Sequence, residues 1–365
     1  MTDHTEPPAA PVFDRERDGR IAITGGAGFI GANLADRMMR EGHDVVILDS
    51  YARPGAEQNA HWLAEQHGMK LRIRRGDIRD RMFVHTSLRD ASVVFHLAAQ
   101  PALTTSITQP RLDFETNALG TFNVLEALRQ MDDPPPLLFA STSKIYGDLP
   151  TLSLSVRRGR YEPDAPALRE RGIDESQPLD FVSPYSCSKG AADQYVLDYA
   201  RLYGLPNTVF RMGCVYGPRQ LGNADQGWIA HLLHQGMRRE PVTIHGDGQQ
   251  VRDVLFVDDL ADAAIAAWRT PAARGHAFNI GGGPERTLTP NELLAMVDAL
   301  EGALVTPRFE PWRPGDPRWY ASDTAAFRSA TGWQPRVGVD EGVRRLHDWL
   351  GSSVDDDVAV DREWP

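Results

Sequence analysis

The stretch "ITGGAGFIG" (residues 23–31) decides the fold, because it joins an apolar strand-like run to a helical pattern through spaced glycines. Gly25, Gly28 and Gly31 permit a tight turn and a close approach of a ligand to the backbone. The free N–H groups and the positive dipole end of the following helix would face two phosphate groups. The spacing therefore predicts a dinucleotide-binding unit of strand, turn and helix.

The carboxylate expected to bind the adenosine ribose is Asp49, which ends the next apolar run 18 residues after Gly31. It would repel a 2′-phosphate, so NAD is favoured over NADP as the cofactor. Arg53 follows nearby, and we interpret it as an exposed loop arginine. Asp77 and Ile78, in "RGDIRD", follow the next run and either hold the adenine edge or form a plain turn.

Further apolar runs ("VVFHLAA", "LLFAST", "NTVFRMG") alternate with helical patterns along the chain. Strands separated by helices of 10–15 residues indicate βαβ units and a parallel sheet buried on both faces. We predict an α/β fold, a Rossmann-type doubly wound parallel sheet with a smaller C-terminal substrate-binding lobe. "DVLFVDD" and "AFNIGG" are expected to return to the main sheet. The predicted parts are a flexible tail (1–19), an NAD-binding domain (20–216, with returning segments 251–282), the lobe (217–250 and 283–350) and an acidic tail (351–365).

Composition limits the partners of this 365-residue chain. A net charge of −11 argues against nucleic acid or an anionic membrane as the main partner. An anionic substrate would then need a local cationic site. The two cysteines give no disulfide framework, and no apolar run is long enough to span a bilayer, so we expect a cytoplasmic protein.

The second decisive stretch is "SPYSCSKGAADQY" (183–195), which begins as a capped helix. It places Tyr185 and Lys189 one turn apart on one helix face. Lys189 is one of only three lysines among 39 cationic residues. An adjacent ammonium and a nicotinamide ring would lower the pKa of the tyrosine, and lowering it by about 3 would make it an effective base. Thr142, which ends "LLFAST", could hold the reacting hydroxyl against it. The alternative is an ordinary helix with an exposed Tyr–Lys pair.

The glycine motif, "HLAAQ", "STSKIYG", "YSCSK", "VYGPRQ" and "RDVLFVDD" occur in order over about residues 20–350. In this the chain resembles the extended short-chain dehydrogenases/reductases, the nucleotide-sugar epimerases and dehydratases. The resemblance implies tightly held NAD, oxidation of a sugar carbon and return of the hydride. It assigns catalysis to Thr142, Tyr185 and Lys189. It assigns the cofactor to Gly25, Gly28, Phe29, Ile30, Gly31, Asp49, Asp77, Ile78, Ala98, Asn117, Tyr185 and Lys189.

Within the family, "YARPGAEQNAHWL", "STSKIYGDL" and "DQGW" are similar to the enzymes that invert carbon 2 of a CDP-linked hexose. Ser143 and Lys144 stand where dehydratases carry an acid and a base, which argues against dehydration. Two alternatives remain open. One is a UDP- or dTDP-sugar 4-epimerase or another NAD-recycling enzyme, and the other is a non-catalytic dinucleotide-binding regulatory protein.

The expected substrate is a nucleotide-diphosphate sugar, and no metal is expected. The residues predicted to bind it are Thr142, Lys144, Arg219, Arg252 and Arg318. The arginines among them suit the bidentate geometry of phosphate. The insert at 151–175 either covers the sugar pocket or forms a solvated loop, and Cys214 replaces the asparagine often found in the family. The resemblance further implies a homo-oligomer, a dimer or a tetramer.

Overall fold

The computed structural model describes residues 19–223, 225–302, 305–313 and 315–354. Most of the predicted N-terminal and acidic tails therefore lies outside the described residues. The last helix, α14 (Val339–Val354), continues past the predicted lobe boundary at residue 350. Among the described residues, no helix combines the length and the apolar character needed to cross a bilayer.

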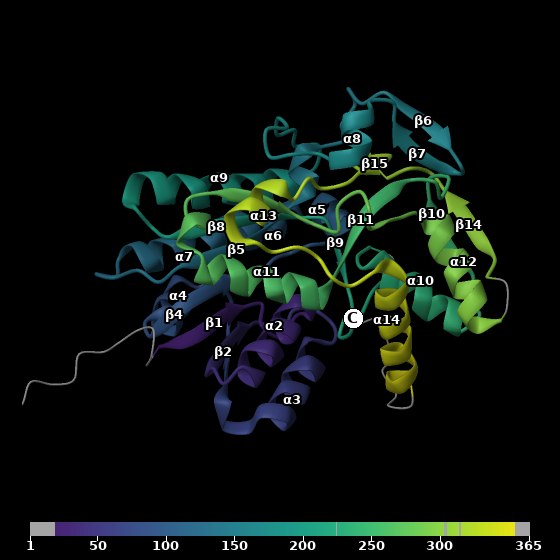
Figure 1. Cartoon of the computed structure of the whole chain (residues 1–365). Coiled ribbons are helices and arrows are strands. Elements are labelled where there is room, and N and C mark those ends of the chain that lie inside the picture. The colour runs from purple at the N-terminus through teal and green to yellow at the C-terminus, as the bar shows by residue number, and fades with distance from the viewer. Residues whose placement is uncertain (1–18, 224, 303–304, 314, 355–365) are drawn as a thin grey trace, which may run out of the picture.

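The main sheet confirms the predicted α/β class. In the described part of the chain its seven strands follow the order β12-β8-β5-β4-β1-β2-β3, and all pairings are parallel (Figure 1). This order reverses direction at β1 and β4, the switch point at which such sheets bind ligands. The strands are β1 (Arg20–Thr24), β2 (Val45–Asp49), β3 (Leu71–Arg75), β4 (Ala91–His96), β5 (Leu137–Thr142), β8 (Asn207–Met212) and β12 (Ala277–Ile280).

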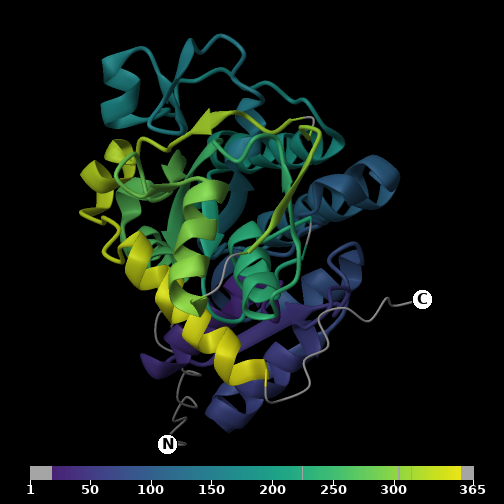
Figure 2. The ribbon, with the colours of Figure 1, turned by 90° about the vertical axis from the view of Figure 1, so that its right-hand side faces the viewer.

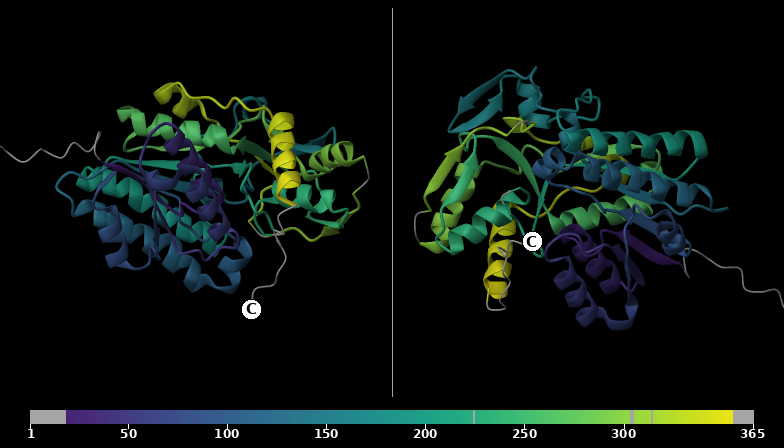
Figure 3. Two further views of the ribbon diagram at one scale, coloured as in Figure 1. Left: turned by 90° about the horizontal axis from the view of Figure 1, so that it is seen from below. Right: turned by 180° about the vertical axis from the view of Figure 1, so that it is seen from behind.

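Helices cover both faces of this sheet, as the apolar runs predict (Figure 3). One face carries α2 (Phe29–Arg40), α3 (Ala56–His67) and α11 (Val257–Arg269). The other carries α4 (Arg81–Leu88), α7 (Gly120–Arg129) and α9 (Pro184–Tyr203). Shorter helices lie before α7 and near the C-terminus: α5 (Leu103–Thr108), α6 (Pro110–Phe114), a π-helical turn (Glu115–Leu119) and α13 (Ala325–Thr331). Every residue of β5 is buried, so this central strand can carry side chains into a site only at its end.

The lobe is built from small sheets and three helices. Its helices α10 (Trp228–Met237), α12 (Pro290–Glu301) and α14 share one apolar core (Figure 2). Strand β10 (Val242–His245) pairs with β14 (Pro307–Glu310). A second sheet joins β9 (Cys214–Tyr216), β11 (Val251–Phe256), β13 (Thr287–Leu288) and β15 (Trp319–Tyr320).

One predicted strand placement is wrong. "AFNIGG" joins the main sheet as β12, but "DVLFVDD" forms β11 and pairs with β9, β13 and β15 instead. The physical reason lies at Gly213, where the chain leaves β8 and continues as β9. A side chain at Gly213 would collide with buried Asp253 of β11, so only glycine allows the two strands to meet there.

The insert is folded onto the lobe. It forms an antiparallel hairpin of β6 (Leu154–Arg157) and β7 (Arg160–Pro163), followed by α8 (Pro166–Arg171). The N–H of Tyr161 donates to the carbonyl of Gln249 at 3.1 Å. The Arg160 side chain donates to the Thr287 hydroxyl at 2.6 Å. These contacts place the insert against the strands that surround β11 rather than in solvent.

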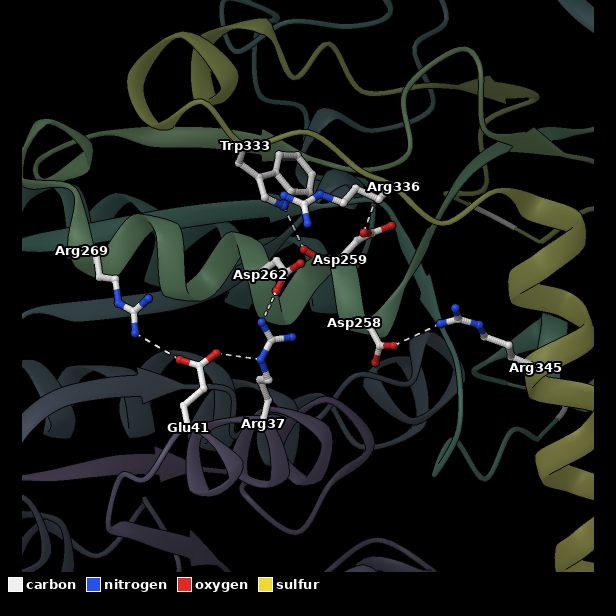
Figure 4. Close-up of polar contacts among 9 residues, drawn as sticks. All are labelled: Arg37, Glu41, Asp258, Asp259, Asp262, Arg269, Trp333, Arg336 and Arg345. Carbon is white, nitrogen blue, oxygen red and sulfur yellow. Dashed lines mark hydrogen bonds and ion pairs between the residues drawn. The ribbon is translucent and has the colours of Figure 1, made fainter.

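Helix α11 ties the sheet to the C-terminal segment (Figure 4). The buried Asp259 carboxylate accepts the N–H groups of Arg336 and Val337 at 3.0 and 2.9 Å. Its backbone carbonyl accepts the Trp333 indole N–H at 3.0 Å. Next to it, Asp262 pairs with Arg37 of α2 at 2.9 Å. One helix thus holds the cofactor-side helix and the chain that leads into α14.

We expect Asp259→Ala to lower the free energy of unfolding by about 1–3 kcal/mol, because two partly buried backbone N–H groups lose their acceptor. Asp259→Asn keeps one acceptor and should cost about half as much. Urea unfolding followed by circular dichroism measures both. Asp262→Asn, at a half-exposed pair, is the control and should change little. Equal stability of Asp259→Ala and the parent would contradict this interpretation.

Candidate active site

The glycine turn has the shape that a diphosphate requires. Gly25 has a φ of +67°, and a side chain there would come within 2.7 Å of the Ala98 nitrogen. At Gly31 a side chain would collide with the carbonyl of Gly25, so the helix can pack this closely only with glycine. Gly28 is the N-cap of α2, and a Cβ there would meet just the Gly25 carbonyl at 3.2 Å. The first turn of α2 therefore presents its N–H groups to an open cradle.

Asp49 holds this turn in place from the end of β2. One carboxylate oxygen accepts the Ala27 N–H at 3.0 Å and the other accepts the Tyr51 N–H at 2.9 Å. Burial raises the pKa of Asp49, and these backbone hydrogen bonds oppose the rise. Each oxygen keeps acceptor capacity for a ribose hydroxyl, so the residues of this turn fit NAD.

Asp77 and Ile78 form a turn after β3. The Asp77 carboxylate is partly exposed and pairs with Arg79 at 2.7 Å, which lowers the pKa of Asp77. Its backbone carbonyl accepts the Asp80 N–H, which closes the turn. Ile78 is buried in the core beside Gly120. The plain-turn alternative accounts for all these contacts.

The loop after β4 is fixed by two polar side chains. The Ala98 N–H donates to the Thr24 hydroxyl at 3.2 Å, and that hydroxyl contacts the His96 ring at 2.6 Å. Burial lowers the pKa of His96 to about 3, so the ring is neutral. Asn117 accepts the Gln100 N–H at 2.8 Å and donates to Ser188 of α9 at 3.1 Å. Asn117 thus ties this loop to the helix turn beside Lys189, as its predicted supporting role requires.

Thr142 and Tyr185 come together at the end of β5. The two side chains lie close together, and the Thr142 side chain lowers the pKa of Tyr185. Burial is the larger effect and raises that pKa to about 12. The Thr142 hydroxyl also accepts the Lys144 N–H at 3.2 Å. Two residues far apart in sequence therefore form one polar unit that can hold a hydroxyl group.

In this structure the described contacts of Lys189 are with the central strand, and its predicted effect on the pKa of Tyr185 stays a prediction. The Lys189 ammonium donates to the Ala140 carbonyl at 2.5 Å and lies over the Phe139 ring at 4.2 Å. Its side chain is almost fully buried, and burial lowers the pKa of Lys189 to about 7. Because a buried ammonium needs an acceptor, the side chain turns to the strand carbonyl rather than to the phenol.

Arg53 is the cation that lowers the pKa of Tyr185 in this structure. Its interpretation as an exposed loop arginine is therefore wrong. The side chain is half-buried, and burial lowers the pKa of Arg53 while the nearby Tyr185 raises it. The loop after β2 thus brings a positive charge toward the phenol. In the sequence, the only feature that could have indicated this role is the position of Arg53 within the stretch "YARPGAEQNAHWL".

Two of the predicted substrate residues meet at a carboxylate that the sequence did not suggest. The Lys144 ammonium pairs with Asp316 Oδ1 at 2.6 Å and donates to the Gly315 carbonyl at 3.3 Å. Arg252 Nη2 lies 2.8 Å from the same oxygen, an ion pair by distance without hydrogen-bond geometry. The two cations hold the pKa of Asp316 far below its usual range. Cys214 lies near both cations, and burial raises the pKa of its thiol.

The other two predicted substrate arginines lie elsewhere. Arg219 stacks on Trp62 of α3 at 3.6 Å and lies 5.8 Å from the Trp349 ring of α14. Arg318 is exposed and stacks over Tyr161 of the insert and Trp312, at 5.5 and 5.4 Å. Neither has a contact to Asp316 among the ion pairs of the described residues. The structure thus brings together Lys144 and Arg252 but not all four cations.

Known proteins share this architecture along nearly the whole chain. A CDP-paratose 2-epimerase of Salmonella typhi is 40% identical over 344 residues, covering 91% of this chain and 99% of that relative. A UDP-glucose 4-epimerase of Mycolicibacterium smegmatis is 32% identical, covering 89% and 96%. The solved UDP-glucose 4-epimerase of Thermus thermophilus in complex with NAD superposes with a TM-score of 0.77 at 32% identity, covering 92% and 99%.

The family model described as "NAD dependent epimerase/dehydratase family" matches residues 21–281. This span contains the glycine turn, Asp49, the Thr142–Tyr185 pair and Lys189. These residues and the parallel sheet that carries them establish that the chain belongs to the NAD-dependent epimerase/dehydratase family.

Proposed function

We propose that this protein is an NAD-dependent nucleotide-sugar epimerase that inverts carbon 2 of a CDP-linked hexose. The observation that carries the proposal is the closeness of Thr142 to Tyr185, with Ser143 and Lys144 where a dehydratase needs an acid and a base. The 40% identity to the Salmonella typhi protein named CDP-paratose 2-epimerase supports the choice of carbon and nucleotide.

The proposed reaction consists of a proton transfer and a hydride transfer. The Thr142 hydroxyl positions the sugar hydroxyl, and Tyr185 as phenolate takes its proton. NAD supplies the hydride acceptor when bound, and its positive ring favours the phenolate, as the nearby Arg53 charge also does. The sugar becomes a flat ketone. After the sugar presents its other face, Tyr185 would return the proton to the oxygen, and the bound cofactor would supply the hydride, so the centre would be inverted.

The binding roles follow from the same arrangement. We assign the cofactor to the glycine turn, Asp49, Ala98, the Asn117 region and Lys189, which belong to the domain at 20–216 with β12. We assign the nucleotide sugar to the lobe at 217–250 and 283–350. Where Asp316 of the lobe meets Lys144 after β5 and Arg252 of β11, the two cations carry one more positive charge than Asp316 balances. Arg318 lies exposed beside the insert, where it can reach a phosphate.

The second candidate is a UDP-sugar 4-epimerase, which the relatives named UDP-glucose 4-epimerase favour. It uses the same proton and hydride transfers at a different carbon. A purely regulatory dinucleotide-binding protein is disfavoured, because such a protein has no use for the Thr142–Tyr185 pair. We propose the cytoplasm as the location, where Cys187 and Cys214 would remain free thiols.

We propose that two copies pair through α7 and α9. Three exposed aromatic rings on these helices gather around buried Tyr199, with Phe122 lying 5.9 Å from Tyr195, and Tyr199 lying 4.8 Å from Tyr203. Phe122, Tyr195 and Tyr203 are 37%, 49% and 52% exposed. Such an exposed apolar surface is typical of a subunit interface. A second copy is the natural occupant because two helices can pair with the same two helices about a twofold axis.

We expect Phe122→Glu with Tyr195→Glu to shift the protein toward the mass of one 40.5 kDa chain, because two charges would be buried in the interface. Sedimentation velocity measures the mass. Met82→Glu, at an exposed apolar residue of α4, is the control and should not change it. A parent protein that sediments as a single chain would overturn the pairing.

We expect Tyr185→Phe to lower kcat by about 10²–10⁴-fold, because the variant loses the group that accepts the proton. Circular dichroism and the NAD content of the purified protein should match those of the parent. Tyr203→Phe, on the exposed face of the same helix, is the matched control and should keep full activity. Turnover by Tyr185→Phe at the parental rate would rule out the phenol as the base.

The carbon that is inverted is tested with isotopes. In ordinary water, CDP-paratose labelled with deuterium at carbon 2 should give a product that keeps its label, because the same hydride returns within one site. Proton NMR follows the label, and UDP-glucose is run beside it. Loss of the carbon 2 label to solvent would exclude hydride transfer. Inversion at carbon 4 of UDP-glucose alone would favour the second candidate.

A further inference from the structure

The loop at 311–318 connects the lobe to the end of the catalytic strand. At one end, Trp312 packs edge-to-face on Tyr161 of the insert, with ring centroids 6.3 Å apart. Further along, Gly315 and Asp316 together hold the Lys144 ammonium. Arg318 then stacks on both aromatic rings. Asp316 is thus the only ionic contact between this loop and the β5 end in the described part of the chain.

Lys144 contacts both Asp316 and Thr142 of the Thr142–Tyr185 pair. Its backbone N–H donates to the Thr142 hydroxyl, which lies next to Tyr185. The side chain of the same residue ends on Asp316. The position of Lys144 therefore bears both on the Thr142 hydroxyl and on Asp316. Hydrogen bonds connect Thr142, Lys144 and Asp316, and Tyr185 lies beside Thr142.

The charges make Asp316 the centre of the arrangement. The side chains of Lys144, Asp316 and Arg252 are 32%, 23% and 9% exposed, so the pairs are only partly screened by solvent. Asp316 alone keeps the two cations close. Without its charge, Lys144 and Arg252 repel each other, and the Lys144 ammonium keeps just the Gly315 carbonyl.

The lobe itself does not depend on this ion pair. Its helices share their own apolar core, and Asp259 fixes the segment that leads into α14. Asp316 is therefore free to act on the relative position of the loop and the catalytic strand. An epimerase has a particular need for such control. Its keto sugar must rotate to present its other face between the two hydride transfers, and it must do so without leaving the active site.

We propose that Asp316 is a positioning residue that, through Lys144, fixes the segment at 315–318 at the end of β5 and retains the keto sugar until it is reduced again. The inference rests on the proposed function. Asp316 thereby sets the partition between completed epimerisation and release of an oxidised sugar. When a keto sugar is released before it is reduced again, the cofactor stays reduced on the enzyme. The amount of bound reduced nicotinamide therefore measures how often the keto sugar is released.

The test uses the full-length holoenzyme with CDP-paratose and two variants, Asp316→Asn and Lys144→Met. Each should lower kcat by about tenfold, equivalent to about 1.4 kcal/mol, and should accumulate reduced nicotinamide during turnover. Mass spectrometry should detect the keto sugar in solution. Thermal melts show that each variant is folded, and two independent variants keep the test decisive if one is unstable.

Two further variants serve as controls. Lys144→Arg keeps the cation and tests rescue, so it should release less keto sugar than Lys144→Met. Arg345→Met breaks the Arg345–Asp258 ion pair between α14 and α11, 3.4 Å long and remote from Thr142, and should release no ketone (Figure 4). The double variant of Asp316→Asn and Lys144→Met should be no worse than either alone, because both remove one interaction.

Three outcomes would overturn the inference. Parental kcat in both variants, with no reduced nicotinamide, would mean that the ion pair does not act on catalysis. A rise in KM alone, without keto sugar, would mean that Asp316 only binds substrate. If the parent enzyme converts neither CDP-paratose nor UDP-glucose, the proposed function fails and the inference falls with it. If the parent enzyme converts a substrate and Asp316→Asn behaves in the same way, the inference is wrong but the proposed function stands.

Discussion

The buried ammonium of Lys189 is the constraint on which the site depends. An unpaired charge in the interior is costly, and this one is balanced by the Ala140 carbonyl of β5 and by nearby Asp113 and Asp193. The bond draws the first turns of α9 onto the central strand. Tyr185, one turn earlier in the helix, is thereby brought to the end of β5, where Thr142 meets it.

A buried polar network keeps this junction rigid. Asp113 accepts the Ser188 hydroxyl at 2.5 Å, and Asn117 joins the same group to the loop after β4. On the other side of Lys189, Asp193 forms a buried pair with Arg211 of β8 at 3.0 Å. Because each member has a partner, the network fixes α9 to β5, to β8 and to the loop after β4 rather than leaving it to apolar packing alone.

The lobe is joined to this rigid part by different means at its two ends. Around α11, backbone N–H groups bind one buried carboxylate, Asp259, which leaves little freedom. Near the site, the contact is the partly exposed pair of Lys144 and Asp316, together with the stacked rings of the insert. Side-chain ion pairs of this kind rearrange more easily than buried backbone hydrogen bonds. This difference between the two contacts suits a site that must hold one substrate in two orientations.

The sequence by itself determined the features that are set by local spacing. The glycine turn, Asp49 at the end of β2, and the strands alternating with helices are consequences of short-range pattern, and the parallel sheet follows from them. The meeting of Thr142 with Tyr185 was also predictable, because strand ends gather at one edge of such a sheet.

Only the tertiary structure decided where charged side chains found their partners. These contacts join residues that lie far apart in the sequence. Lys189 bonds the Ala140 carbonyl 49 positions away, Arg53 approaches Tyr185 across 132 positions, and Lys144 meets Asp316 across 172 positions. Arg252 reaches the same carboxylate. The departure of β11 from the main sheet belongs with them. A long flexible side chain can reach several acceptors, and which one it takes depends on burial and charge that exist only after the chain has folded.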